Sequence, residues 1–70
     1  MKIYIVQKKI TENFNDCIET ITLAVFRQLE GAKKFVEKQK DFNGWDSGSL
    51  ETKEDKKGNW YSIIPTETKD

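Results

Sequence analysis

Seventy residues allow one domain, and 12 basic and 12 acidic residues leave no net charge. A chain of this length buries only about 60 % of the surface that its unfolded form exposes, so its stability margin is small. Balanced charge argues against non-specific DNA binding, which depends on a positive field. With one cysteine and no histidine, we expect no disulfide, no metal site and a reducing, cytoplasmic setting.

Two strands are predicted at the start of the chain. In residues 2–10, Ile3 and Ile5 point to one face while Tyr4 and Val6 point to the other. Residues 17–26 also alternate and are rich in β-branched side chains. The polar residues 11–16 between them predict a loop, so a hairpin is the simplest pairing of the two strands.

A helix is predicted next, over residues 28–40, because the period of the apolar residues changes after Phe26. Its apolar face consists of Leu29, Ala32, Phe35 and Val36. No Ser, Thr, Asp or Asn directly precedes Leu29, which predicts a weak N-cap. Asn43-Gly44 suits a left-handed residue or a tight turn after the helix.

The second half of the chain predicts a hairpin. Residues 49–55 form a charged strand candidate in which only Leu50 is apolar, and a turn is predicted at residues 55–59, where Gly58 can take a positive φ. The last strand is predicted at 60–64, ended by Pro65, with residues 66–70 as a frayed tail. The fold class is therefore α+β: one domain over residues 1–70, with three to four antiparallel or mixed strands and one helix on one sheet face (β-β-α-β-β).

The apolar face of the predicted helix should pack on one side of this sheet and form the core there. We expect nine residues to pack together: Ile3, Ile5, Ile21, Leu23, Val25, Leu29, Ala32, Phe35 and Val36. The other sheet face, with Tyr4 and Val6, is then left without cover from the single helix. Three covers stay open: a second copy of the chain in a homodimer, a different protein, or the 42–48 loop with Trp45 folded over that face.

No catalytic set is visible in the sequence. Acid–base catalysis near neutral pH most often uses histidine, which is missing, and Cys17 therefore has no histidine to activate it. Gly44 and Gly48 lack the following Lys-Ser or Lys-Thr of a phosphate loop. We expect a protein that is not an enzyme, with no catalytic, cofactor-binding or metal-binding residues.

Aromatic residues in or beside loops are the informative feature. Trp and Tyr are common anchors at protein interfaces. The predicted partner-binding residues are Tyr4, Val6, Phe14, Trp45, Trp60 and Tyr61.

The stretch from Ala24 to Val36, AVFRQLEGAKKFV, resembles a pattern in short, uncharacterised bacterial and bacteriophage proteins. In those proteins a strand ends in Val-Phe and a helix follows with Glu-x-Ala-x-x-Phe-Val. The resemblance covers the first half of the chain and implies a fold with a strand–strand–helix opening, without an activity.

Three functions are compatible with these features. The leading expectation is a small protein-interaction module, in the manner of a phage- or prophage-encoded inhibitor that binds and occludes a host protein, and a bacterial accessory or structural subunit is equally compatible with these features. The second is a nucleic-acid-binding accessory protein whose aromatic sheet face stacks bases, flanked by Lys8-Lys9 and Lys56-Lys57. The third is a small-ligand-binding protein with a pocket between helix and loop, near Trp45. No apolar run is long enough to span a membrane.

Overall fold

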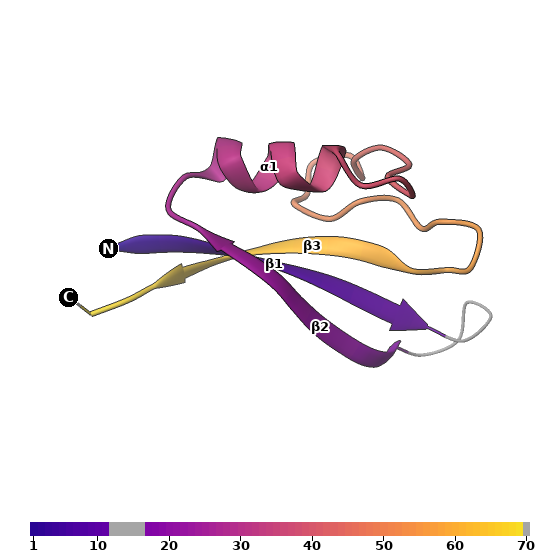
Figure 1. Ribbon diagram of the computed structural model, residues 1–70, viewed down its shortest axis with the longest axis horizontal. Helices are drawn as coiled ribbons and strands as arrows, with labels where there is room; N and C mark the ends of the chain where they lie inside the picture. The colour runs from indigo at the N-terminus through magenta and orange to yellow at the C-terminus, as the bar shows by residue number, and fades with distance from the viewer. Residues whose placement is uncertain (12–16, 70) are drawn as a thin grey trace.

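The computed structural model describes residues 1–11 and 17–69, and its elements follow the order β1 (Lys2–Thr11), β2 (Cys17–Phe26), α1 (Leu29–Glu37) and β3 (Trp60–Glu67). The strands form one antiparallel sheet in the order β2-β1-β3, and α1 lies across one face of it (Figure 1). The predicted α+β class and the single helix on one sheet face are confirmed. The order β-β-α-β-β is wrong, because the described residues contain three strands.

The hairpin of β1 and β2 has a register that fixes which side chains share a face. Ile5 lies opposite Val25 and Val6 opposite Ala24, and then the register shifts, so that Gln7 lies opposite Thr22. The shift is a bulge that leaves one extra residue, Leu23, in β2.

The last strand is longer than predicted and continues through Pro65, which lies opposite Tyr4. The N–H of Ile63 points away from β1, since it donates to the carbonyl of Leu50 at 2.9 Å. By alternation the nitrogen of Pro65 faces the same open edge, where a missing N–H breaks no ladder bond. The predicted frayed tail is wrong for residues 66–68, because Thr68 N–H donates to the Met1 carbonyl at 2.8 Å.

The segment before β3 runs beside it without forming the predicted strand. Glu51 bridges Ser62, and Thr52 N–H donates to the Tyr61 carbonyl at 2.9 Å, but the pairing stays isolated. Leu50 is the only apolar residue that this segment packs against the core. The predicted turn is confirmed, since Gly58 has a φ of 87° and donates to the carbonyl of Asp55 at 3.0 Å.

The core lies between α1 and the sheet, on the face that we expected to be uncovered. Its buried residues are Val6, Ala32, Val36, Tyr61 and Ile63. Partly buried side chains pack around them, from the strands, the helix and the loop after it: Tyr4, Phe26, Leu29, Phe35, Phe42, Trp45 and Leu50. The helix residues were predicted correctly.

The strand residues of the predicted core were assigned to the wrong face. Phe26 ends β2 and packs against the helix residue Phe35, with ring centroids 5.6 Å apart. Because the chain enters α1 within three residues of Phe26, the helix covers the face on which Phe26 lies. The register places Tyr4 and Val6 on that face, and Ile3 and Ile5 on the opposite one.

Helix α1 begins without a side-chain cap at Gln28, as predicted, and is shorter at its C-terminal end than expected. The chain turns after Lys38, where Phe42 N–H donates to the Gln39 carbonyl at 3.1 Å. The side chain of Gln39 also donates to the Phe35 carbonyl at 3.0 Å, which satisfies one of the open carbonyls at the helix end.

Gly31→Ala is expected to give no gain in stability, although alanine is favoured over glycine in a helix by about 1 kcal/mol. A Cβ at residue 31 would lie 3.2 Å from Cδ1 of Phe26, whose ring is held against Phe35. Thermal unfolding should show an unchanged or lower melting temperature. In a Phe26→Leu background the same change should raise it, and a gain in the unmodified protein would contradict the contact.

Candidate functional site

The outer face is the side of the sheet that turns away from α1, and its apolar half consists of five aliphatic side chains. Ile5 lies at the centre, opposite Val25 on one side and Ile64 on the other, with Ile3 and Leu23 beside them. Val25 is 54 % exposed, Leu23 39 % and Ile64 36 %. Phe42 and Trp45 pack against the core on the helix side, so the 42–48 loop is not the cover of the outer face.

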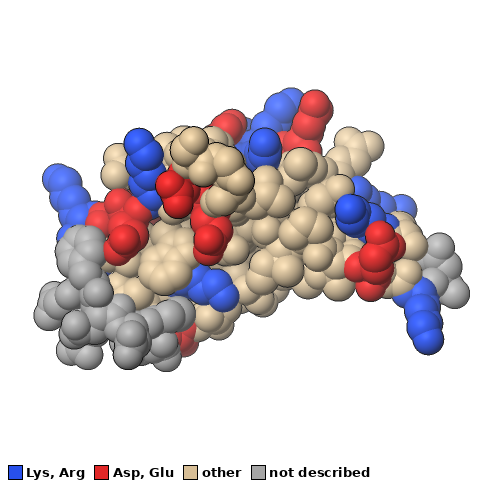
Figure 2. All heavy atoms as spheres, turned by 180° about the vertical axis from the view of Figure 1, so that it is seen from behind, with Lys and Arg blue, Asp and Glu red and all other residues tan. Residues whose placement is uncertain are grey.

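The other half of the outer face is polar and internally bonded. Lys9 donates to Gln7 Oε1 at 3.2 Å and to Thr20 at 3.4 Å. Lys9 is the only charged residue that the described register places on this face of the three strands. Seen from behind, charged side chains gather along the helix side and at the two ends of the molecule, and the middle is mostly uncharged (Figure 2).

The predicted partner-binding residues do not form one surface. Val6 and Tyr61 are buried in the core and offer no free surface, whereas Tyr4 and Trp45 are partly buried and pack against that core. Tyr61 therefore has no open ring face on which a base could stack, as the nucleic-acid hypothesis requires of it.

Trp60 is the one predicted partner-binding residue among the described residues that lies on the outer face. It lies opposite Lys9 on the outer face, is partly exposed, and donates from Nε1 to Glu51 at 3.1 Å. Phe14 and the side chain of Cys17 lie outside the described residues. Val25 and Ile64 were not predicted as surface residues, although both are exposed. The signal that could have identified them is the short connection from Phe26 into the helix.

Lys8, Asp41 and Tyr61 form a polar cluster at one end of the core. The Tyr61 hydroxyl donates to Asp41 Oδ1 at 2.7 Å, and the Lys8 ammonium lies 3.1 Å from Oδ2 and 5.4 Å from the centre of the Tyr61 ring. Burial, followed by the hydrogen bond to Asp41 and its negative charge, raises the pKa of Tyr61 far above its ordinary 10.0.

The pKa of Asp41 is lowered from its ordinary 3.8. Burial alone would raise it, but the hydrogen bonds from Tyr61 and Lys8 and the charge of Lys8 outweigh burial. All three polar groups are thus engaged with one another, and Tyr61 is kept neutral, so the arrangement favours a structural role. No spacing in the sequence connects these residues, because the turn after α1 brings Asp41 to the sheet.

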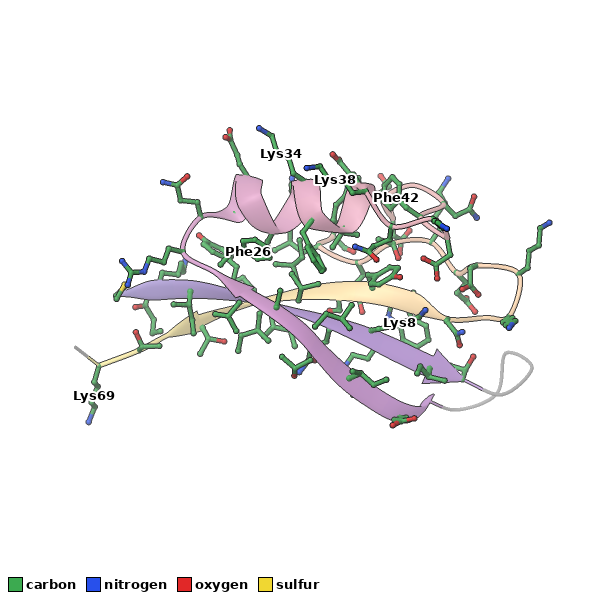
Figure 3. The ribbon with its side chains drawn as sticks, viewed as in Figure 1. Lys8, Phe26, Lys34, Lys38, Phe42 and Lys69 are labelled. Atoms are coloured by element: carbon green, nitrogen blue, oxygen red, sulfur yellow. The ribbon has the colours of Figure 1, made fainter. Side chains whose placement is uncertain are left out.

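A hollow of about 550 Å³ opens beside this cluster, and we call it the lysine pocket. Lys8 and Phe42 approach it from the sheet and from the segment after α1 (Figure 3). Trp45 is not among its lining residues, which differs from the small-ligand pocket that we expected. The pocket is lined by Lys8, Lys40, Asp41, Phe42, Asn43, Asp55, Lys56, Lys57 and Asn59.

In the part of the chain that the structure describes, no group of three or more Cys, Asp or Glu side chains lies close enough to hold a metal ion. No helix within that part is both long and apolar enough to cross a membrane.

Comparison with protein-family models, with curated proteins and with solved structures finds no match to this chain. The resemblance of residues 24–36 to short bacterial and bacteriophage proteins therefore stays a prediction. The outer face and the lysine pocket are the two surfaces from which a function can be inferred.

Proposed function

We propose that this protein is a non-enzymatic protein-interaction module that binds through its outer face, and that a second copy of the same chain occupies that face. The observation that carries the proposal is the row formed by Val25, Ile5 and Ile64 across all three strands, over which no helix or loop of the described residues packs. Antiparallel sheets commonly leave one face to water, but that face is then polar. An aliphatic row at this position is typical of a face that packs against another layer.

The size of the face supports a weak dimer. A strand of 10 residues is about 33 Å long, and three strands spaced about 4.8 Å apart give a face of roughly 450 Å². Two such faces would bury at most about 900 Å² in total, below the roughly 1,200–2,000 Å² of stable complexes. We therefore expect a dissociation constant of about 10–100 µM.

The distribution of charge permits a second copy as the occupant. A two-fold axis that runs across the strands near Ile5 would stack the apolar halves on each other. Each Lys9 lies four residues from Ile5, about 13 Å along the strand, so the two lysines would lie roughly 26 Å apart at opposite ends. This separation exceeds the Debye length of about 8 Å at physiological salt, and the repulsion is screened.

Sedimentation equilibrium over about 5–200 µM should show a monomer–dimer equilibrium that Val25→Glu abolishes. A carboxylate buried without a partner between two apolar faces is strongly unfavourable. The control is Ile21→Glu, which makes the same kind of change in the same strand. Ile21 is 37 % exposed and lies opposite Lys8, on the helix side of the sheet, so its variant should still dimerise.

A monomer throughout that range would overturn the second copy as the occupant. Equal loss of dimer in both variants would also overturn it, because the effect would then come from added charge and not from the outer face. Circular dichroism of each variant must show the unmodified secondary structure, since a monomer that has unfolded is not the expected result.

A further inference from the structure

The lysine pocket concentrates positive charge, although the chain as a whole has no net charge. Four lysines and two aspartates line it, a local excess of two positive charges (four minus two). Lys40 comes from the turn after α1, and Lys56 and Lys57 come from the turn before β3, so two segments distant in the sequence converge there. Convergent cations on a concave surface attract an anionic ligand.

Both carboxylates of the pocket already have partners inside the protein. Asp41 accepts hydrogen bonds from Tyr61 and Lys8, and Asp55 Oδ1 accepts from the N–H groups of Lys57 at 2.8 Å and Asn59 at 3.0 Å. Neither aspartate forms an ion pair with Lys40, Lys56 or Lys57 among the described residues. Among the described residues these three ammonium groups have no ion-pair partner, which suits them to an external anion.

The rest of the lining adds an aromatic wall and an amide donor. Phe42 is held in place by an edge contact with Trp45, at 5.6 Å between ring centroids. Asn59 Oδ1 accepts the N–H of Thr11 at 2.9 Å, which fixes its orientation and leaves its amide nitrogen as a donor. The pocket thus pairs a flat apolar group with cations and a hydrogen-bond donor.

We propose that the lysine pocket binds a small phosphorylated ligand with a planar ring, of the nucleotide class. Lys40, Lys56 and Lys57 would hold the phosphate as point charges, and Phe42 would contact the ring. The volume of about 550 Å³ falls in the usual range of small-molecule sites, roughly 300–1,000 Å³. A mononucleotide fits better than a polynucleotide, because a neutral chain offers no continuous positive track for a phosphate backbone.

This site is independent of the proposed dimer, since its residues come from the turns after α1 and before β3 and, for Lys8, from the helix side of β1, and not from the outer face. Its occupation can therefore be tested with the protein as a monomer or as a dimer. The two proposals can fail separately.

The test is an NMR titration of ¹⁵N-labelled protein with AMP at low salt. Amide signals of residues 40–43 and 55–59 should shift with a dissociation constant of about 1 mM or lower. The double variant K56Q/K57Q should weaken binding at least about tenfold. The matched control K34Q/K38Q removes two lysines that point away from the sheet (Figure 3), and its affinity should stay within about twofold.

Two other probes test the class of the ligand. Inorganic phosphate and adenosine should each bind more weakly than AMP, since each lacks one half of the recognised chemistry. Equal affinity for phosphate and AMP would overturn the role of the ring, and a short oligonucleotide that binds much more tightly than AMP would overturn the small ligand. The absence of shifts at about 10 mM AMP, or equal weakening by the control variant, would overturn the site.

Discussion

Val6→Ala is expected to lower the free energy of unfolding by about 2–3 kcal/mol, whereas Val25→Ala is expected to lower it by less than about 1 kcal/mol. Both changes remove the same two methyl groups from neighbouring strands. Val6 has no exposed surface and packs in the core beneath α1, while Val25 is 54 % exposed on the outer face. The first variant leaves a cavity that its neighbours fill only partly, and the second loses little more than β-propensity.

Thermal unfolding at about 1 µM, where the expected dimer is dissociated, measures the two effects in the monomer. For a chain of this size, 2–3 kcal/mol corresponds to a fall in melting temperature of about 10–20 °C. An equal fall in melting temperature for the two variants, or a larger fall for Val25→Ala, would contradict a core that lies between α1 and the sheet.

The elements of this fold could be predicted from local patterns. The alternation of β-branched residues located β1 and β2 to within about one residue at their ends. Ala32 and Val36 were identified by the helical period, and Gly58 by the chemistry of its turn. Each of these signals depends on residues within a few positions of one another, so a single sequence contains it.

The face of the sheet that α1 covers could not be predicted in the same way. Apolar side chains occupy both faces of β1, Ile3 and Ile5 on one and Tyr4 and Val6 on the other, so the strand period does not distinguish them. The bulge at Leu23 reverses the alternation of side chains between the two sheet faces in the middle of β2. No residue in the sequence indicates this bulge. For this reason Tyr4 and Val6 were expected on the uncovered face, whereas they pack with Trp45 and Tyr61 on the side that α1 covers.

Pro65 shows a similar limit. A proline ends a central strand, and that rule predicted the end of β3 at residue 64. Whether the rule applies depends on the neighbours of the strand, which follow from the sheet order β2-β1-β3 and not from the local sequence.

Tyr61→Phe is expected to lower the free energy of unfolding by about 1.5–3 kcal/mol at pH 7 and by much less at the two ends of the pH scale. No other of these variants is expected to depend as strongly on pH. The variant removes the hydroxyl that donates to Asp41 Oδ1 at 2.7 Å and leaves a half-buried carboxylate with one partner fewer. Asp41 has a lowered pKa, so its contribution to stability is present above its ordinary 3.8 and is lost as pH falls through the lower folded value.

At alkaline pH the sign follows from the raised pKa of Tyr61. The folded protein keeps this hydroxyl protonated, while the unfolded chain ionises it above about pH 10, so its contribution is present below that pH and is lost as pH rises toward the folded value. The difference in unfolding free energy between the unmodified protein and Tyr61→Phe should therefore rise and then fall across the pH scale. Urea unfolding from about pH 2.5 to 11 measures this difference, and Tyr4→Phe provides the same chemical change at the other tyrosine. A difference that stays constant with pH would mean that the Tyr61–Asp41 hydrogen bond does not stabilise the fold.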